Sequence, residues 1–383
     1  MAKKRTIEEI NDKIRSGRAV VLTAEQVASM GRESTPAEIA EKVDVVTTGT
    51  FGPMCSSGMF INFGHTDPPM RMERVTLNNV PVFAGIAAVD AYIGATETAL
   101  PYDQYGGAHI IEELIAGREV LLQATAKGTD CYPRTEVKTL ISRDTVNEMI
   151  MFNPRNAYQN YNVAVNSTTA IKYTYMGTLL PSFGNATFST SGELSPLLND
   201  PDMRTIGIGT RIFFGGATGY VAWHGTQFNT GKPVNKHGIP LGNAATLALI
   251  GDARMMSTRF IRAAYFEKYG VSIFVGVGIP IPVLDEDMAR RVMIRNSQIE
   301  TNIIDYGSPG HDVLGRADYA SLFGGEITLN GKKIRTAPLS SVKVAREIAD
   351  TLREEITAGR FLITEPAEQF QKTSGLNSLD IRL

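Results

Sequence analysis

Residues 271–291 read VSIFVGVGIPIPVLDEDMARR, and this stretch indicates a buried strand followed by a helix. The run Val271–Val277 is short, apolar and rich in β-branched residues, which is typical of a buried strand. After Gly278–Pro282, three acidic residues open the next segment at Asp285. Acidic side chains stabilise the first turn of a helix, so a helix is predicted to begin there. This order of elements favours an α/β protein.

Three more segments combine a helix, a glycine and a short β-type run. The charged, apolar-periodic helices contain TIEEINDKI, AHIIEELI and AREIADTLREEI, and they lead into Gly17, Gly117 and Gly359. Glycine suits the position after a helix because it adopts positive φ without steric cost. We predict a further helix between Asn243 and Tyr269, in ARMMSTRFIRAAYFEKYG, which Gly270 ends.

The middle of the chain has a different composition. Residues 158–230 are rich in Thr, Ser, Asn, Tyr and Gly, and they contain β-type runs at 170–175 and 210–214. This pattern predicts strands joined by long polar loops. The expected fold is therefore α/β, with mixed sheets, flanking helices and polar glycine-rich loops in the middle third. We expect one catalytic region over 1–383, with two subdomains at about 1–157 and 158–383.

Charge and hydropathy limit the partners of the chain. It has 383 residues, with 38 basic and 40 acidic side chains. No basic field is available for nucleic acid or an anionic membrane surface, so small-molecule or protein partners are favoured. The apolar stretches are short or interrupted by Asp90 and Asp252, and MAKKRTIEEI lacks the apolar core of a signal peptide. We therefore expect a cytoplasmic protein.

Both cysteines of the chain lie in sequences typical of turns. Cys55 lies in GTFGPMCSSG (49–58), and Cys131 lies in GTDCYP (128–133). A free cysteine is commonly a small buried hydrophobic residue. The exposed amides of a turn, however, can stabilise a thiolate, which is the nucleophilic form. Two cysteines are too few for a cysteine-ligated iron–sulfur cluster or a Cys₄ zinc site, and no HExxH motif is present. We expect no bound cofactor and no metal.

Histidine and arginine residues supply the other candidates. His65 and His224 could act as acid or base, although a loop histidine is more often only exposed or locally hydrogen-bonded. Arg134 and Arg211 could bind a substrate carboxylate, although a structural salt bridge is at least as common for such residues. The glycine-rich runs match neither the GxGxxG nor the GxxxxGK[ST] pattern in the required context.

Four segments together resemble the homocysteine-biosynthesis family of anaerobic archaea and bacteria. They are KRTIEEINDKIRSGRAVVLTAEQV, VTTGTFGPMCSSGMFINFGHTDPP, KGTDCYPR and SFGNATFSTSGELSPLLNDP. The resemblance implies an L-aspartate semialdehyde sulfurtransferase, in which Cys131 carries a persulfide and Cys55 resolves or relays the sulfur. Some members of this family carry a C-terminal pair of CBS domains, and the resemblance places no such pair within these residues.

The implied reaction converts aspartate semialdehyde, sulfide and two electrons into homocysteine and water. Because the sequence shows no dinucleotide fingerprint and no cluster ligands, the electrons would come from outside the chain. The resemblance implies a ferredoxin-like iron–sulfur partner. We expect both cysteine loops to converge on one pocket, and a homo-oligomer would be compatible with the sequence.

Two other functions are compatible with the same residues. GPMCSSG is faintly similar to the cysteine loop of nucleotide dehydrogenases that oxidise inosine monophosphate, although their phosphate-binding glycine pairs are not matched. A non-catalytic protein that carries persulfide sulfur to another enzyme is the second alternative.

Overall fold

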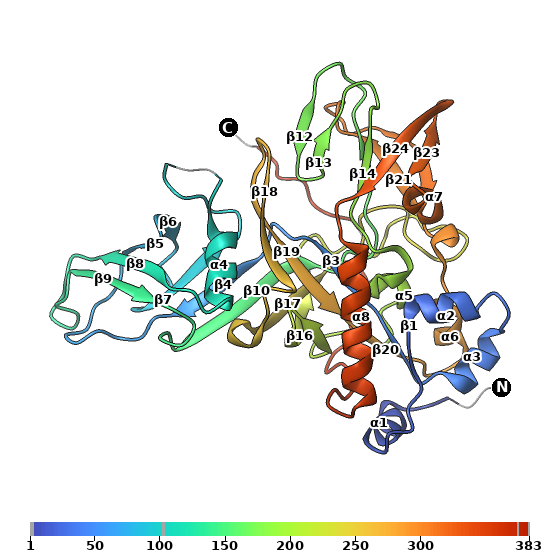
Figure 1. Cartoon of the computed structure of the whole chain (residues 1–383), viewed down its shortest axis with the longest axis horizontal. Coiled ribbons are helices and arrows are strands. Elements are labelled where there is room, and N and C mark those ends of the chain that lie inside the picture. Colours follow the sequence, from blue (N-terminus) through green and yellow to red (C-terminus); the bar gives the residue numbers. More distant parts are fainter. Residues whose placement is uncertain (1–3, 102–103, 374, 382–383) are drawn as a thin grey trace.

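The computed structural model describes residues 4–101, 104–373 and 375–381, and it confirms the α/β class (Figure 1). Several sheets pack around the centre of the molecule, and helices flank them. The hairpin of β18 (Ile261–Phe266) and β19 (Gly270–Gly278), with the strands beside it, positions the residues of the candidate site.

A nine-stranded antiparallel sheet lies at the centre of the described structure. Its strands are β3 (Thr50–Pro53), β4 (Gly58–Asn62), β7 (Asp90–Gly94), β10 (Glu148–Asn156), β15 (Arg211–Phe214), β16 (Ala217–His224), β17 (Leu247–Asp252), β18 (Ile261–Phe266) and β19 (Gly270–Gly278). Their order is β18-β19-β15-β16-β17-β10-β4-β7, and β3 pairs with β19 as well. The β10–β17 pairing joins strands on either side of residue 157, near which we expected a division into subdomains.

The helix predicted in ARMMSTRFIRAAYFEKYG is wrong. This segment instead forms the 3₁₀ turn η2 (Ala253–Met255) and the strand β18. Strand β18 pairs with β19 along its whole length, from Ile261 opposite Val275 to Phe266 opposite Gly270. The periodicity of the segment suggested a helix, but β19 is a buried strand whose backbone groups need partners. Pairing with β18 satisfies them, and it also leaves Gly270 at the hairpin turn.

Smaller sheets surround the central one. One contains β1 (Val21–Thr23), β2 (Val45–Thr47) and β20 (Pro280–Pro282). A four-stranded sheet at the left of Figure 1 contains β5 (Arg74–Leu77), β6 (Val80–Val82), β8 (Val120–Thr125) and β9 (Glu136–Ile141). A six-stranded sheet at the upper right contains β11 (Val163–Val165), β14 (Ala186–Phe188), β21 (Glu300–Asp305), β22 (Val313–Asp318), β23 (Glu326–Leu329) and β24 (Lys332–Pro338). The remaining pair is the hairpin of β12 (Lys172–Thr174) and β13 (Gly177–Leu179).

The helices cover the outside of these sheets. They are α1 (Ile7–Arg15), α2 (Ala24–Met30), α3 (Pro36–Lys42), α4 (Gly107–Ile115), α5 (Pro196–Asn199), α6 (Glu286–Val292), α7 (Tyr319–Phe323) and α8 (Val342–Thr357), with 3₁₀ turns η1 (Gly192–Leu194) and η3 (Asn296–Gln298). Among the described residues, no helix is both long enough and apolar enough to cross a membrane.

The predicted glycine-ended helices are confirmed as α1, α4 and α8. The glycines that follow them, Gly17, Gly117 and Gly359, have φ values of +67°, +75° and +75°. Strands β1 and β8 follow the first two helices, as predicted. After α8, residues 361–363 form no strand, although the side chains of Phe361 and Ile363 are buried. The predicted helix after Val271–Val277 is α6, whose N-cap is Asp285.

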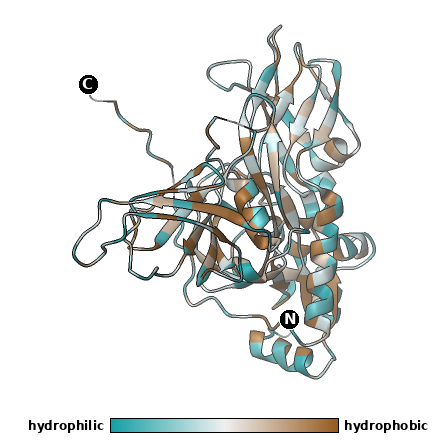
Figure 2. Cartoon of the chain, turned by 60° about the vertical axis from the view of Figure 1, so that its left-hand side comes forward, coloured by the Kyte–Doolittle hydropathy of each residue, from teal (hydrophilic) through white to brown (hydrophobic). Residues whose placement is uncertain are grey.

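Helix α8 fixes the strands that lead to the candidate site. It packs against β3 and β19, where a Cβ on Gly276 or Gly278 would lie within 3 Å of the Ile348 side chain. Ile348 and Leu352 are fully buried. Burying a side chain of this kind contributes about 1.5–3 kcal/mol to folding. Figure 2 shows the hydrophobic residues concentrated along the interior strands and the hydrophilic ones along peripheral helices and loops.

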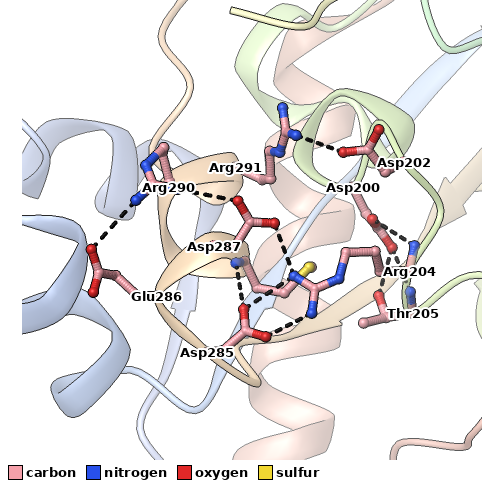
Figure 3. A network of polar contacts seen from close by, with 10 residues as sticks. Asp200, Asp202, Arg204, Thr205, Asp285, Glu286, Asp287, Arg290 and Arg291 are labelled. Carbon is pink, nitrogen blue, oxygen red and sulfur yellow. Dashed lines mark hydrogen bonds and ion pairs between the residues drawn. The ribbon is translucent and has the colours of Figure 1, made fainter. Parts of the chain in front are cut away.

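An ion-pair network joins α6 to the loop that contains Asp200 (Figure 3). The Arg204 guanidinium donates to Asp285 at 2.6 Å and to Asp287 at 3.0 Å. These hydrogen bonds lower the pKa of the Asp285 carboxyl to about 2. Asp285 also accepts a hydrogen bond from the Met288 amide, which caps the helix. The network therefore stabilises both the start of α6 and the position of the loop.

Candidate functional site

Cys55 lies in the turn between β3 and β4, opposite a residue of β19. Pro53 pairs with Phe274 in antiparallel register, and the Met54 amide donates to the Ile273 carbonyl at 2.7 Å. The chain then turns at Cys55, and Cys55 and Ser272 of β19 line the same cavity. The Cys55 side chain is half-buried.

Local hydrogen bonds hold the Cys55 turn in place. The Ser57 hydroxyl donates to the Met54 carbonyl at 2.7 Å, and the Asn153 amide donates to the Ser57 hydroxyl at 2.8 Å. Gly58 is required at the end of the turn, because a Cβ there would overlap the Tyr92 side chain. The pairing of β3 with β19 and the hydrogen bonds of the turn therefore set the position of the thiol, more than contacts of the Cys55 side chain do.

The Cys55 side chain lines a cavity of about 500 Å³. This cavity, which we name the Cys55 pocket, lies where the turn meets the β12–β13 and β18–β19 hairpins. Its polar lining consists of Cys55, Ser56, Arg155, Tyr158, Tyr161, Tyr175, Ser189, Gln227, Lys232, Asn243, Thr246, Tyr269 and Ser272. A four-carbon amino acid fits within such a volume.

Positive charge dominates the lining of the Cys55 pocket. Arg155 and Lys232 line it, and the described lining residues include no aspartate or glutamate. No ion pair joins either cation to a carboxylate of a described residue. A partly desolvated cation without a counter-ion favours an anionic ligand, and a guanidinium binds carboxylates especially well. The pocket is therefore suited to a small acid.

Tyrosine hydroxyls form the second group of polar atoms in the pocket. Tyr269 lines the same cavity as Cys55. The Tyr175 and Tyr306 hydroxyls are hydrogen-bonded at 2.7 Å. Burial raises the pKa of Tyr158 to about 12, and it raises the pKa values of Tyr161, Tyr269 and Tyr306 as well. These hydroxyls therefore stay protonated near neutral pH and can donate hydrogen bonds.

Cys131 is exposed and does not line the Cys55 pocket. It lies in the turn between β8 and β9, where Thr129 and Tyr132 exchange backbone hydrogen bonds at 2.9 and 3.0 Å. This turn packs against residues 65–69, which follow β4. Because β4 alone carries the chain about 13 Å away from the Cys55 turn at about 3.3 Å per residue, the two cysteine loops do not meet in that pocket. The expected convergence is not seen in the single chain.

His65 and Arg134 accompany Cys131 in the structure. The His65 ring stacks on Tyr132, the neighbour of Cys131, with ring centroids 6.2 Å apart. The Arg134 guanidinium donates to the carbonyls of Asp67 and Pro68. Arg134 thus ties the Cys131 turn to the 65–69 segment. The candidate acid/base His65 lies beside the exposed thiol and does not line the Cys55 pocket.

His224 and Arg211 lie outside both cysteine regions. The His224 ring packs against Phe228, with centroids 5.2 Å apart, at the end of β16. The Arg211 guanidinium lies over the Phe361 ring at 4.5 Å, and its buried Nε has no hydrogen-bond partner among the described residues. Neither side chain lines the Cys55 pocket.

The sequence analysis missed Arg155, Lys232, Tyr269 and Ser272. Arg155 lies just before the end of β10, and Tyr269 and Ser272 lie in the β18–β19 hairpin, which we had predicted to begin as a helix. The one available signal was the density of tyrosine between residues 158 and 175. Long-range pairing brings three of them toward the thiol: β3 with β19 for Tyr269 and Ser272, and β4 with β10 for Arg155.

The comparisons agree on one family. A family model described as "Homocysteine biosynthesis enzyme, sulfur-incorporation" matches residues 19–363. No solved structure gives a significant match.

Two curated relatives carry the same name, "L-aspartate semialdehyde sulfurtransferase". The protein from Methanocaldococcus jannaschii is 50% identical over 379 residues, which cover 94% of this chain and 72% of the relative. The protein from Methanosarcina acetivorans is 46% identical over 378 residues, which cover 98% and 74%. An uncharacterised protein from Methanothermobacter thermautotrophicus is 28% identical over 84% of this chain.

Proposed function

Because the chain belongs to the homocysteine biosynthesis enzyme family, we propose that it is an L-aspartate semialdehyde sulfurtransferase whose carbon–sulfur bond forms in the Cys55 pocket. The observation that carries this proposal is the lining of that pocket. It combines a thiol, two cations without carboxylate partners and protonated tyrosine hydroxyls. The cations suit the carboxylate of the substrate, and the thiol and hydroxyls suit its aldehyde.

Arg155 is the first choice for the substrate carboxylate. It is half-buried in the Cys55 pocket, whereas Arg134 is engaged by backbone carbonyls and Arg211 lies over Phe361. Lys232 is exposed at the same pocket and supplies a second, more solvated charge. Holding the carboxylate at one end of the pocket fixes the aldehyde carbon near the thiol, which raises the effective concentration of the reactants.

The two cysteines have different tasks in this proposal. The exposed Cys131 thiolate attacks the outer sulfur of an external persulfide donor, the donor leaves as its thiolate, and Cys131 carries the sulfur as a persulfide. The Cys55 thiolate attacks the outer sulfur of that persulfide, the S–S bond breaks, and its electron pair leaves on the Cys131 thiolate. This transfer is redox-neutral. It moves the persulfide from an accessible loop into the pocket where the substrate is bound.

The electron balance follows from the oxidation state of the sulfur. From sulfide, conversion of the aldehyde to homocysteine consumes two electrons and two protons and releases water. Persulfide sulfur is two electrons more oxidised, so the reaction from a persulfide consumes four electrons. Two of them cleave the S–S bond after the outer sulfur has attacked the aldehyde carbon. Loss of water then gives a thioaldehyde, and the other two electrons reduce its carbon.

An external iron–sulfur protein of the ferredoxin type is the proposed electron donor. This part of the proposal rests on the family resemblance and on the absence of a dinucleotide fingerprint in the sequence. Single-electron carriers of low potential can deliver the electrons one at a time. The Cys131 turn, exposed beside His65 and Tyr132, is accessible to a protein of that kind.

The test is an anaerobic assay with aspartate semialdehyde, a persulfide donor and a low-potential reductant. Homocysteine should form with the wild-type chain and not without it. Cys55→Ala should abolish formation with any sulfur source, and Cys131→Ala should reduce it most when sulfur is supplied at low concentration. Sulfur transfer to an added acceptor enzyme without any homocysteine would instead support a sulfur carrier and contradict the proposal.

Mixing the two cysteine variants at a low concentration of the sulfur donor tests how the separated cysteines cooperate. If the Cys131 loop of one copy serves the Cys55 pocket of another, a mixture of Cys55→Ala and Cys131→Ala chains is more active than Cys131→Ala alone. If the loop serves the pocket of its own chain by moving toward it, the mixture gains no activity over Cys131→Ala alone. Either result is compatible with sulfurtransferase activity, but only the first makes a second copy part of the site.

A further inference from the structure

The Cys55 pocket contains a pair of hydroxyl groups placed to receive the oxygen of a reacting carbonyl. Ser272 is buried, lies in β19, which pairs with the strand that leads into the Cys55 turn, and lines the pocket. Its hydroxyl has no hydrogen-bond partner among the described residues. Leaving a buried polar group without a hydrogen-bond partner costs about 1–3 kcal/mol. Such a group in a cavity therefore indicates that a ligand atom supplies the missing hydrogen bond.

Tyr269 is the second hydroxyl of this pair. It lies at the turn of the β18–β19 hairpin, three residues before Ser272, and it lines the same pocket as Cys55. The ring packs edge-on against Tyr175, with centroids 6.1 Å apart. Tyr175 in turn is hydrogen-bonded to Tyr306 and is partly exposed to solvent. Partial burial raises the pKa of the Tyr269 hydroxyl, which is protonated at neutral pH.

We propose that the Tyr269 and Ser272 hydroxyls bind the aldehyde oxygen of the substrate, and that Tyr269 gives this oxygen its proton when sulfur attacks. The inference rests on the proposed function and identifies the acid that the sequence analysis sought in His65 and His224. Neither of these histidines lines the pocket. Tyr269 is a catalytic residue in this scheme because it gives its proton to the reacting oxygen.

The step is balanced without an electron donor. The outer persulfide sulfur on Cys55 forms a bond to the aldehyde carbon, and the carbon–oxygen double bond becomes a single bond. Its electron pair moves to oxygen, which takes the Tyr269 proton, and the Ser272 hydroxyl donates a hydrogen bond to the same oxygen. The tyrosinate regains a proton from solvent, to which Tyr269 is partly exposed.

Substitutions of Ser272 and Tyr269 test this scheme. For Ser272, a catalytic role and a structural role predict opposite changes in melting temperature and kcat. Ser272→Ala removes a hydroxyl that lacks a partner in the free protein, so the melting temperature should stay unchanged or rise while kcat falls. Removing one such donor lowers kcat by about 100-fold in comparable sites. A structural role for Ser272 predicts the reverse, with a lower melting temperature and an unchanged kcat.

Tyr269→Phe keeps the ring and removes the hydroxyl. We expect kcat to fall by about 100-fold or more, because general acids contribute about that much, while KM for aspartate semialdehyde stays near the wild-type value. Tyr220→Phe, on an exposed tyrosine of β16 that does not line the pocket, is the matched control. L-homoserine has the substrate's carbon skeleton without an aldehyde. It should inhibit Tyr269→Phe and Tyr220→Phe as strongly as it inhibits the wild type.

The outcomes separate this inference from the proposed function. If the wild type makes no homocysteine, the proposed function fails. If the wild type is active and Tyr269→Phe keeps more than about a tenth of its kcat, the proposed function stands and the Tyr269 assignment is overturned. A loss that appears only in KM also overturns it, because a proton donor acts on the chemical step.

Discussion

Replacing Arg155 by alanine should weaken recognition of the substrate carboxylate. Arg155 is half-buried, lines the Cys55 pocket and makes no ion pair with a described carboxylate, so its charge is available to the ligand. A hydrogen bond to a charged group contributes about 1.5–3 kcal/mol, which corresponds to about tenfold to about 100-fold in kcat/KM. Lys232 is exposed, and an exposed ion pair contributes about 0.2–1 kcal/mol, or at most about fivefold.

The assay is steady-state formation of homocysteine, with aspartate semialdehyde varied at a saturating persulfide donor and reductant. Arg155→Ala should raise KM more than Lys232→Ala does, and Arg155→Lys should recover part of the loss. Arg254→Ala is the control, because Arg254 pairs with Asp252 and Glu148 and does not line the pocket.

A substrate without a carboxylate makes the test sharper. Butanal lacks the group that Arg155 is proposed to bind, so the preference of the wild type for aspartate semialdehyde over butanal should shrink in Arg155→Ala. If Arg155→Ala leaves both KM and this preference unchanged, or if Lys232→Ala has the larger effect, the assignment of the carboxylate to Arg155 is refuted.

Three further predictions concern stability and sulfur loading. Asp285→Asn should lower the free energy of unfolding by about 1 kcal/mol at neutral pH. Because Arg204 lowers the folded-state pKa of Asp285 to about 2, this difference should vanish in melting curves as the pH falls from about 4, near the unfolded pKa, to about 2. Gly49→Ala should destabilise the fold by about 1–3 kcal/mol in chemical denaturation, since its Cβ would overlap the Ala345 carbonyl. The control Gly94→Ala, with no atom within 4 Å of the added Cβ, should have little effect. After treatment of Cys55→Ala with a persulfide donor, the Cys131 peptide should gain about 32 Da, one sulfur atom, in its mass spectrum; no gain on either cysteine in the wild type would rule out the persulfide route.

Local sequence signals predicted the helices and strands that depend on neighbouring residues. The glycines after α1, α4 and α8 were identified because a positive φ at that position is a local requirement. The acidic start of α6 was identified for the same kind of reason. The segment that forms β18 was predicted wrongly, because its partner β19 decides its structure and that pairing is not visible in the helical periodicity of the segment itself.

In the candidate site too, local features were predicted from the sequence and features that depend on long-range pairing were not. The turn around Cys55 was recognised from its glycine, proline and serine neighbours, which are local. The residues that surround the thiol come from β10, from the loop that contains Lys232 and from the β18–β19 hairpin. More than 200 positions separate Cys55 from Ser272, and the pairing of β3 with β19 brings them to one pocket. The pairing of His65 and Arg134 with Cys131 likewise depends on how the β8–β9 turn packs on residues 65–69.

The most direct test of the account is the protection of each cysteine by a bound substrate analogue. The anaerobic, reduced protein is alkylated with iodoacetamide in the presence and absence of saturating L-homoserine, and the modified peptides are quantified by mass spectrometry. If the substrate occupies the Cys55 pocket, homoserine slows alkylation of Cys55 and leaves that of the exposed Cys131 unchanged. Protection of Cys131 without protection of Cys55 would contradict the placement of the reaction in this pocket.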